Sequence, residues 1–446
     1  MNMATNPDQD TKPASWREIA QNAFNARDWS LVEKATAQLL ARDPADANAL
    51  IWRAAVHQAH DDFAKAERLL REAMRIMPQH PIVLNWLALC MKEQARFTEA
   101  EALLRKALRI APQNAYVRFN LSDLELRAGD YAQGWADYEA RFDLNLRFNG
   151  ADVALAKIST PWRGESLAGR TLVVYGEQGN GDCLWAFRFL RVLAARVQGE
   201  GGRVILGYAG PMESLFARML PPDVSLETRL DTHPDFHCAL MSLPLRLGLF
   251  DAPPQEGQRG APYLQADAAR VAVWRARVMA HTSAGERPVG LVWNGQTNHV
   301  RDARRSLPDD LLGALLDVPG ITFFVLSPER GATVNAWRAR GAHLVDLTPQ
   351  FDTASGFDDT AALVSCVDRV VTIDSGPAHL AGALGVPTSL LLDHVSSWFW
   401  GAETARTRWY DSVELYRQPQ VSDWAPVLEA VRARLERLVK EKGKGG

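Results

Sequence analysis

The chain has 446 residues, of which 47% are hydrophobic and 23% charged, enough for folded cores and more than one domain. Basic and acidic residues nearly cancel, and the net charge of −3 excludes a composition suited to nucleic acid or an anionic membrane. The start, 1–13, has no signal-peptide core, and no later window approaches about 18 unbroken apolar residues, so we expect a cytoplasmic protein without an integral membrane segment. Four cysteines without paired spacing predict reduced, mostly buried thiols.

The first third of the chain repeats with a period of 34 residues. Aromatic residues and prolines recur at this step and keep one register, which unrelated amphipathic helices would not explain. The period predicts tetratricopeptide repeats, whose paired helices stack and leave a groove, with small residues at the close approaches and each proline ending a second helix. The aromatics are Trp29, Phe63, Phe97 and Tyr131, the prolines are Pro44, Pro78 and Pro112, and the small residues are Ala66, Ala73, Ala100, Ala107 and Gly134.

Beyond the repeats, β-like runs alternate with helical runs, which predicts doubly wound parallel sheets. A charged helical and polar stretch separates three strands from five, so we expect two Rossmann-like halves facing one cleft. The runs lie at 171–175, 204–208, 236–240, 289–293, 321–326, 344–347, 370–373 and 388–392. We divide the chain into a disordered start (1–15), repeats (16–145), a linker (146–169), an amino-terminal half (170–266), a linker helix (267–288), a carboxyl-terminal half (289–440) and a frayed tail (441–446).

The strand at 370–373 breaks into a polar turn that opens an Ala/Leu-rich helix. Ser375 fits the N-cap, Gly376 lets the backbone approach a ligand, and Pro377 suits the first helical position. Free N–H groups and the positive end of the helix dipole favour a phosphate there. The sequence therefore predicts an anion-binding turn flanked by Asp374 and His379.

A second polar turn, 176–183, follows the first predicted strand and enters a helix. It is not a P-loop, because no Gly-Lys-Ser/Thr follows, and Gly179 and Gly181 lack the third glycine of the dinucleotide fingerprint. Glu177 and Asp182 remain as carboxylates that could take a proton from an attacking hydroxyl. The alternative for Asp182 is that it only caps the helix and complements its dipole.

The strand at 289–293 leads into a basic loop that begins at Asn294 and carries Arg301, Arg304 and Arg305. Three arginines at a strand end opposite the anion-binding turn could neutralise a diphosphate, with charge-assisted hydrogen bonds of about 1.5–3 kcal/mol each. The alternative is a solvated surface loop.

No metal site is expected from the sequence. His233 and His237 have metal-like spacing, but Pro234 between them breaks the helix that would align them. The only Asp-x-Asp pair, Asp8 and Asp10, lies in the expected disordered start. A further aromatic cluster is interpreted as core or inter-domain packing in preference to a sugar platform. It consists of Trp398, Phe399, Trp400, Trp409 and Tyr410.

Three of these elements together resemble a known family. The turn Asp374-Ser375-Gly376-x-x-His379-Leu380-Ala381, the pair Gly181-Asp182 and the element Arg305-Ser306-Leu307-Pro308 are similar to those of the heptosyltransferase-like glycosyltransferases of GT-B fold. From about residue 29 to 424, the arrangement resembles bacterial tetratricopeptide-repeat proteins with a glycosyltransferase-like carboxyl-terminal region, distantly related to O-GlcNAc transferase. The implied fold is an α-helical repeat array followed by an α/β GT-B-like region.

The resemblance implies that the carboxyl-terminal half binds a nucleoside-diphosphate sugar as substrate, with neither cofactor nor metal. Arg305 falls where heptosyltransferases carry a phosphate-binding lysine, and it keeps the charge. Ser375 and Gly376 would donate to the diphosphate, and Asp374 would face the sugar hydroxyls or the turn itself. The remaining donor-side candidates are Arg304 and Asn294.

On the acceptor side, the resemblance implies that Asp182 is the base that activates the acceptor hydroxyl. His379, one turn into its helix, is the second catalytic candidate, and Glu177 and Gln178 are the acceptor-side candidates. The amino-terminal half shows only three recognisable strands, fewer than a full acceptor domain carries. We therefore expect the repeats to present a protein or peptide acceptor along their groove.

The leading hypothesis is a metal-independent glycosyltransferase that modifies a protein or a cell-surface glycan. The alternative is a non-catalytic scaffold, in which the repeats bind proteins and the α/β region is a degenerate transferase. A third possibility, a sugar-nucleotide epimerase on the same fold, needs additional acid/base residues that the sequence does not reveal.

Overall fold

The computed structural model describes residues 15–144, 154–229, 233–250, 260, 262–296, 301–328, 331–402 and 405–442. They fall into two compact units, Met1–Leu124 and Glu125–Gly446, which are taken separately below. The expected disordered start, apart from Ser15, and the tail from 443 lie outside the described residues.

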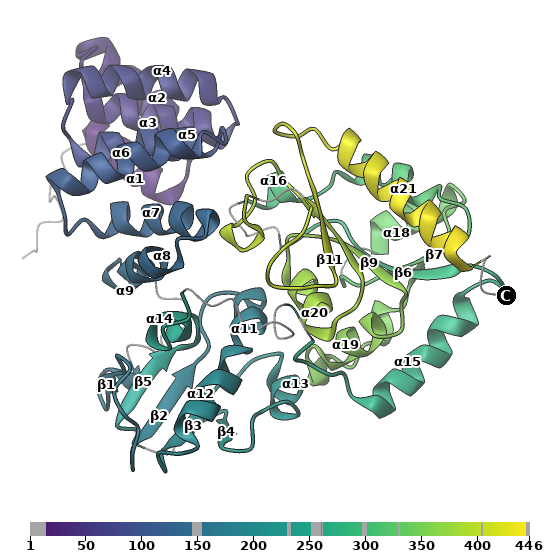
Figure 1. Ribbon diagram of the computed structural model, residues 1–446. Helices are drawn as coiled ribbons and strands as arrows, with labels where there is room; N and C mark the ends of the chain where they lie inside the picture. Colours follow the sequence, from purple (N-terminus) through teal and green to yellow (C-terminus); the bar gives the residue numbers. More distant parts are fainter. Residues whose placement is uncertain are drawn as a thin grey trace, which may run out of the picture. The chain divides into compact units, whose positions relative to one another are not determined.

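The first unit is built of antiparallel helix pairs (Figure 1). Helices α2, α4 and α6 begin at the predicted aromatics, and the periodic prolines follow two residues after each of these helices ends. The four alanines of the repeat register are fully buried, which confirms the predicted close approach of the paired helices. The helices are α1 (Trp16–Ala26), α2 (Trp29–Arg42), α3 (Ala47–Ala59), α4 (Phe63–Ile76), α5 (Pro81–Lys92), α6 (Phe97–Ile110) and, crossing the boundary, α7 (Ala115–Ala128).

After the end of α7, the second unit continues with the last repeat helix, α8 (Tyr131–Tyr138), and the short α9 (Ala140–Asp143). A Cβ on Gly134 would come within 2.9 Å of the Leu126 side chain, so α8 lies tightly against the end of α7. The α8–α9 pair therefore belongs to the compact unit that also contains both parallel sheets.

The first sheet has five parallel strands in the order β1-β5-β2-β3-β4. Sequence analysis predicts three of them and misses β1 and β4, which are only two and four residues long. The strands are β1 (Thr160–Pro161), β2 (Thr171–Tyr175), β3 (Arg203–Gly207), β4 (Val224–Glu227) and β5 (Phe236–Ala239). The helices are α11 (Asn180–Ala186), α12 (Phe189–Val197), α13 (Glu213–Ala217), η1 (Leu240–Ser242) and α14 (Leu243–Arg246).

The second sheet has six parallel strands in the order β11-β10-β9-β6-β7-β8, that of a doubly wound nucleotide-binding fold. Five of them match predicted strands, and β11 is additional. The predicted linker helix is α15 (Ala268–His281), capped by Asp267. The strands are β6 (Arg287–Val292), β7 (Ile321–Val325), β8 (Leu344–Asp346), β9 (Arg369–Ile373), β10 (Thr388–Leu392) and β11 (Val413–Arg417). The remaining elements used below are α16 (Asp302–Arg305), α17 (Gly313–Leu316), α18 (Gly331–Ala339), α19 (Asp358–Val364), α20 (Gly376–Leu384) and α21 (Ala425–Lys442).

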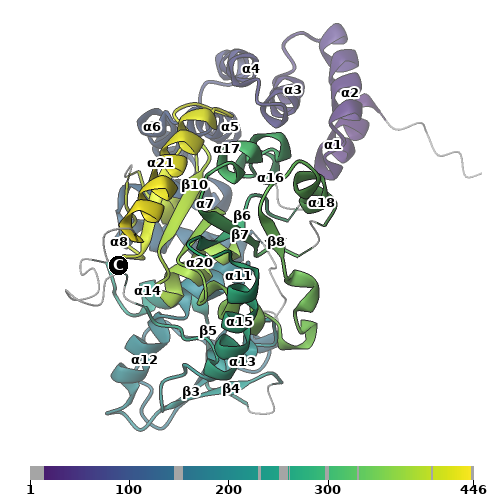
Figure 2. The same ribbon diagram turned by 90° about the vertical axis from the view of Figure 1, so that its right-hand side faces the viewer.

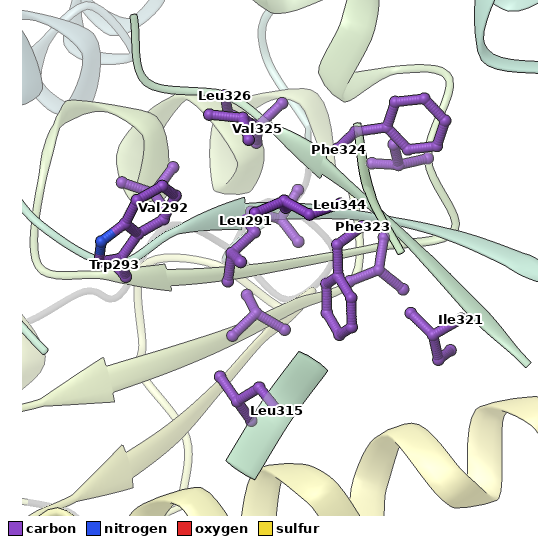
Figure 3. Packing of buried hydrophobic residues seen from close by; sticks show 14 of the residues in the cluster. Leu291, Val292, Trp293, Leu315, Ile321, Phe323, Phe324, Val325, Leu326 and Leu344 are labelled. Atoms are coloured by element: carbon purple, nitrogen blue, oxygen red, sulfur yellow. The ribbon is translucent and has the colours of Figure 1, made fainter. Parts of the chain in front are cut away.

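Helices cover both faces of the second sheet. Figure 1 shows its strands between α21 on one side and α15, α19 and α20 on the other, and Figure 2 shows the long α21 from a second direction. The core is a layer of aliphatic and aromatic residues from neighbouring strands, among them Leu291, Phe323 and Phe324, each at most 1% exposed (Figure 3). This rigid layer fixes the positions of the strand ends, where the site is built.

Candidate functional site

The chain reverses its direction through the second sheet between β6 and β9. Strands β7 and β8 extend the sheet beyond β6, whereas β10 and β11 extend it beyond β9. In open parallel sheets, ligands bind beyond the carboxyl ends of the strands at such a reversal. Asn294 follows β6 by two residues and Asp374 follows β9 directly, so these two of the predicted donor-side residues lie at this point.

Arg305 joins the two turns at this crevice. Its Nη1 donates to the backbone carbonyl of Asp374 at 2.9 Å, and its Nε lies 3.4 Å from Oδ1 of Asp302. The guanidinium covers Gly295, where an added Cβ would come within 2.4 Å of Nη2. The Arg305 side chain remains 15% exposed, so a cation is held at the strand ends with part of its surface accessible.

The other candidates around Arg305 differ in what they contact. Arg301 donates to Oδ2 of Asp393 at 2.7 Å, so a carboxylate offsets its charge, and Arg304 lies half-buried in α16. Within the described residues, Oδ1 of Asn294 is buried without a hydrogen-bond partner. An orphaned buried acceptor at a strand end is the kind of group that a ligand donor would satisfy.

The turn between β9 and α20 has the predicted form with two differences. The helix begins at Gly376, one residue before the predicted position. Ser375 is the N-cap residue, but its hydroxyl donates to the carbonyl of Ile373 at 3.2 Å and makes no capping bond. A Cβ on Gly376 would meet no atom closer than 4.0 Å. The start of α20 thus offers an approachable backbone without a side-chain cap, the arrangement that an anion uses.

The carboxyl group of Asp374 is partly buried beside this helix start. Burial raises the pKa of Asp374, and the neighbouring Asp393 adds to the rise. The Trp400 side chain, Arg305 and the backbone N–H of Ser397 act in the opposite direction. The net rise favours the protonated form relative to an exposed aspartate, and a protonated carboxyl can donate as well as accept hydrogen bonds.

Asp182 lies in the first turn of α11. Its Oδ2 accepts from the backbone N–H of Gly179 at 2.9 Å, which confirms a capping contact. Burial, with smaller contributions from the carboxylates of Glu177 and Asp374, raises the pKa of Asp182 to about 7, although the hydrogen bond from the backbone N–H of Gly179 acts in the opposite direction. A carboxyl that titrates near neutrality is suited to act as a general base. Capping and base catalysis are therefore compatible, and the catalytic role of Asp182 stays a prediction.

The starts of α11 and α20 touch each other. A Cβ on Gly181 would lie 2.8 Å from Cδ2 of His379 and 3.6 Å from Cα of Gly376. Only glycine fits here, so the chain brings Asp182 to the anion-suited turn through direct contact between the two halves.

His379 is 4% exposed and lies among aromatic rings. Its Nδ1 is hydrogen-bonded with the Tyr410 hydroxyl at 2.9 Å, and its ring stacks on Trp400 at 4.9 Å. Burial lowers the pKa of His379 to about 3, with a smaller contribution from the Arg188 cation. The imidazole is therefore neutral at neutral pH, which suits packing between the halves better than proton donation, and a catalytic role stays a prediction.

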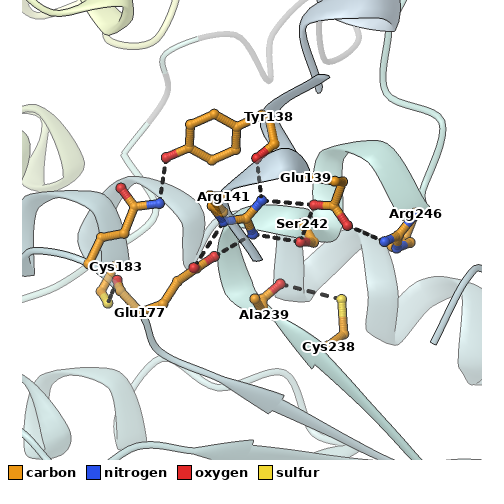
Figure 4. A network of polar contacts seen from close by, with 10 residues as sticks. Tyr138, Glu139, Arg141, Glu177, Cys183, Cys238, Ala239, Ser242 and Arg246 are labelled. Carbon is orange, nitrogen blue, oxygen red and sulfur yellow. Dashed lines mark hydrogen bonds and ion pairs between the residues drawn. The ribbon is translucent and has the colours of Figure 1, made fainter. Parts of the chain in front are cut away.

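The two acceptor-side candidates are bound by the last repeat. The carboxylate of Glu177, 3% exposed, receives two hydrogen bonds from Arg141, at 2.6 and 3.0 Å (Figure 4). The side-chain amide of Gln178 contacts the Tyr138 hydroxyl. In this structure both side chains hold the α8–α9 pair, and contact with an acceptor stays a prediction for each.

The aromatic cluster packs the two halves together, as predicted. Trp185 of α11 lies at its centre, with its ring 5.5 Å from that of Trp398, 5.0 Å from that of Phe399 and 5.0 Å from that of Trp409. The ring of Trp135 in α8 stacks on Trp185 at 5.8 Å. The cluster therefore joins the last repeat, the amino-terminal half and the carboxyl-terminal half within one unit.

Sequence reasoning missed Arg141 and gave Tyr410 no polar role. Arg141 lies 36 residues before the glutamate that it pairs with, and no motif connects the two. One signal was available: an arginine next to the large apolar residues Tyr138 and Phe142 can stack on both rings, which lie 4.6 and 4.2 Å from its guanidinium carbon.

The cysteines and the described histidines lie in contacts that do not suggest a metal site. All four cysteines are free thiols and three are buried, as predicted. Nδ1 of His237 lies 2.8 Å from the Ser159 hydroxyl. Across the part of the chain that the structure describes, no three His, Cys, Asp or Glu side chains are grouped to hold a metal ion. Nor does any helix in that part have the length and apolar character needed to span a bilayer.

Comparison with protein families agrees with the two parts of the chain. Residues 57–105 match the tetratricopeptide repeat, and residues 320–423 match glycosyltransferase family 9, the heptosyltransferases. Together with the two parallel sheets, these matches give the chain an amino-terminal tetratricopeptide-repeat region and a carboxyl-terminal region with a glycosyltransferase family 9 domain, which confirms the predicted fold class and agrees with the predicted enzyme class.

Individual proteins resemble the chain at low sequence identity. The chain is 27% identical over 350 residues to protein FlbA of Caulobacter vibrioides, covering 72% of this chain and 55% of FlbA, so it spans about half the length of that relative. The E. coli ADP-heptose lps heptosyltransferase II structure is 15% identical, with a TM-score of 0.43, and the match covers 61% of this chain and 99% of that one. A variant of Thermobaculum terrenum O-GlcNAc transferase is 13% identical, with a TM-score of 0.34 and coverage of 96% and 92%.

Proposed function

We propose that this protein transfers a sugar from a nucleoside-diphosphate sugar to a hydroxyl of a protein or a cell-surface glycan, without a metal or cofactor. The observation that supports it best is the contact between α11 and α20. It brings Asp182, with a pKa of about 7, to a helix start that Arg305 holds from the other side. A base candidate and an anion-suited turn thus lie at one point of the molecule.

The proposed chemistry is a direct displacement at the anomeric carbon. The Asp182 carboxylate accepts the proton of the acceptor hydroxyl while that oxygen bonds to the anomeric carbon. The bond from this carbon to the diphosphate breaks, and the nucleoside diphosphate leaves with the electron pair. Arg305 and the uncapped start of α20, with Ser375 and Gly376, stabilise the charge that develops on it.

On the donor side, we assign Asn294 and Asp374 to the sugar or its nucleotide. Asn294 supplies the buried acceptor without a partner among the described residues, and Asp374 supplies a carboxyl group with a raised pKa. Arg304 is assigned to the same side as a second cation.

We further propose that the repeats of the first unit bind a protein or peptide acceptor. Stacked tetratricopeptide helices form an extended groove suited to a peptide, and residues 57–105 match this repeat family. The match to FlbA covers 72% of this chain, more than either family match alone.

Nucleotide binding is the first test. We expect one of UDP, ADP or GDP, at millimolar concentration, to raise the melting temperature of the parent and of Arg170→Ala but not of Arg305→Ala. Arg170 is a matched control because it is 59% exposed and pairs with Asp235 on the surface. A ligand at one hundred times its dissociation constant stabilises the folded state by about 2.7 kcal/mol. If no nucleotide or nucleotide sugar shifts the parent, the proposal fails and the scaffold alternative replaces it.

A further inference from the structure

The strand order of the first sheet also reverses, and the Arg141 side chain occupies the strand ends at that point. Strand β2 is followed in the chain by β3 and β4 on one side of it, and then by β5 on the other, so the ligand crevice of this half would lie beyond the ends of β2 and β5. The residues that follow these strand ends include Glu177 and Ser242. Arg141 of α9 bonds to both of them.

The guanidinium of Arg141 is fully buried and fully satisfied. Its Nε and Nη2 donate to the two carboxylate oxygens of Glu177, and Nη2 also donates to the Ser242 hydroxyl at 2.7 Å. Its Nη1 donates to the carbonyl of Tyr138 at 3.1 Å and to Oε1 of Glu139 at 2.9 Å. Figure 4 shows these five bonds converging on one side chain, which matches the five N–H groups that arginine carries.

The same contacts hold the loop that leads to Asp182. Gln178, next to Glu177, has a left-handed backbone with φ of 62°, a conformation that costs energy for a residue other than glycine. Its side chain is tied to Tyr138, and the carbonyl of Glu177 accepts from Sγ of Cys183 at 3.3 Å. The surroundings therefore enforce one conformation of the segment between β2 and Asp182.

We propose that Arg141 is a positioning residue of the transferase site, which closes the crevice of the amino-terminal half to small ligands and holds, through Glu177, the loop that carries Asp182. This inference rests on the proposed function. Closing the crevice removes the enclosed space in which a small free acceptor would bind. It therefore favours an acceptor hydroxyl carried on a protein, which agrees with the proposed binding of a protein acceptor by the repeats.

The first experiment removes the guanidinium and adds it back. In the full chain, Arg141→Ala is expected to melt lower than the parent, and about 10 mM methylguanidine should raise its melting temperature, because the vacated crevice keeps its acceptors. Methylammonium at equal concentration should not raise the melting temperature of Arg141→Ala, because it lacks the paired N–H donors of a guanidinium. Arg170→Ala, on an exposed pair, should respond to neither. Equal responses of the two variants to methylguanidine would overturn the proposal.

The second experiment separates positioning from stability. With the nucleotide sugar identified by the binding test, Arg141→Ala should bind its nucleotide as the parent does, yet turn over roughly tenfold slower or worse, with methylguanidine restoring turnover. An unchanged turnover rate, or a weakened nucleotide affinity with unchanged maximal turnover, would overturn the positioning role. A parent that binds no nucleotide would instead defeat the proposed function, so the two failures are distinguishable.

A third experiment uses Glu177→Gln. This variant keeps a hydrogen-bond acceptor for Arg141, and the Arg141 side chain stays in the crevice. Among the described residues, the charged or titratable groups that act on or lie beside Asp182 are Glu177, Asp374, Tyr138, Cys183 and His379. Removing the Glu177 charge removes one cause of the raised pKa of Asp182, so the acid limb of the turnover profile should move to lower pH. An acid limb at the parent's pH would show that Glu177 does not act on Asp182 and would overturn the proposal.

Discussion

Gly181 and His379 are in direct contact across the two halves of the second unit: a Cβ on Gly181 would lie 2.8 Å from Cδ2 of the imidazole. The imidazole cannot retreat, because it is 4% exposed and stacked on Trp400 at 4.9 Å. The separation of the two helix starts is therefore set by the absence of a side chain at residue 181.

Gly181→Ala should separate α11 from α20. Because a methyl group cannot fit against the ring without a shift, we expect nucleotide binding to persist while turnover falls by roughly a hundredfold. Gly199→Ala is the matched control, since a Cβ there meets no atom within 4 Å. Nucleotide-dependent melting and nucleoside diphosphate release measure the two effects. Equal turnover of the two variants would show that the contact does not position the site.

The activity of the parent should depend on the ionised form of Asp182. Because burial raises the pKa of Asp182 to about 7, kcat/KM should be level above that pH and fall about tenfold per pH unit below it. Asp182→Asn should lose roughly a hundredfold or more, because the amide cannot accept the proton. A full pH series of nucleoside diphosphate release checks both. If Asp182→Asn stays active and its kcat/KM falls over the same acidic pH range as that of the parent, Asp182 is not the base.

The same carboxyl should weaken folding at high pH. Its pKa is raised from about 3.9 in the unfolded chain, so the folded state holds the proton more tightly and stability falls as pH rises from about 4 to about 7. Asp182→Asn should therefore melt at least about 2 °C higher than the parent at pH 8 and close to the parent at pH 4. Thermal melts at the two pH values test this, and a lower melting temperature for the variant at pH 8 would contradict it.

The fold could be predicted from local patterns, whereas the site could be predicted only in part. The repeat period and the apolar runs are properties of neighbouring residues, and they located the helix pairs and eight of eleven strands. Of the three missed strands, β1 and β4 are too short to show a pattern, and the third is β11 (Val413–Arg417). The turns at Asp182 and Asp374 also carry local signatures.

The missing parts of the site are contacts between distant segments. Arg141 and Glu177 are 36 residues apart, and Arg301 and Asp393 are 92 apart. The sequence shows that Glu177 is a carboxylate at a strand end, but whether it meets solvent, substrate or arginine depends on where α9 packs. Packing alone decides such pairings, so sequence reasoning assigned Glu177 to the acceptor and grouped all three arginines at the diphosphate.

Trp185 should be the main anchor of the aromatic cluster. It is fully buried and contacts rings from α8 and from the segment at 398–409, so Trp185→Ala should cost about 3–5 kcal/mol of unfolding free energy. Trp185→Phe should cost much less, because it keeps part of the ring and removes an indole N–H that is buried without a partner among the described residues. Chemical denaturation of both variants compares them, and similar losses would argue against a packing role.

The contact of Asp358 with Arg218 and Ser214 also joins the two halves, and we expect it to affect the stability of the protein at acidic pH. Burial acts to raise the pKa of Asp358, but Arg218 and the Ser214 hydroxyl outweigh it, and the net pKa lies below the usual value. Such a group contributes stability above its unfolded pKa, and that contribution is lost as pH falls through the folded value.

Asp358→Asn should therefore melt below the parent at pH 7, and the two curves should converge near pH 3. Asp223→Asn, at an exposed carboxylate in the same unit, is the control and should track the parent throughout. Arg218→Met should lower the melting temperature more than Asp358→Asn, because it leaves a buried carboxylate without its cation, whereas the amide keeps the shape of the contact and removes the charge. A pH-independent difference between Asp358→Asn and the parent would mean that packing around Asp358, not its ionisation, holds α13 to α19.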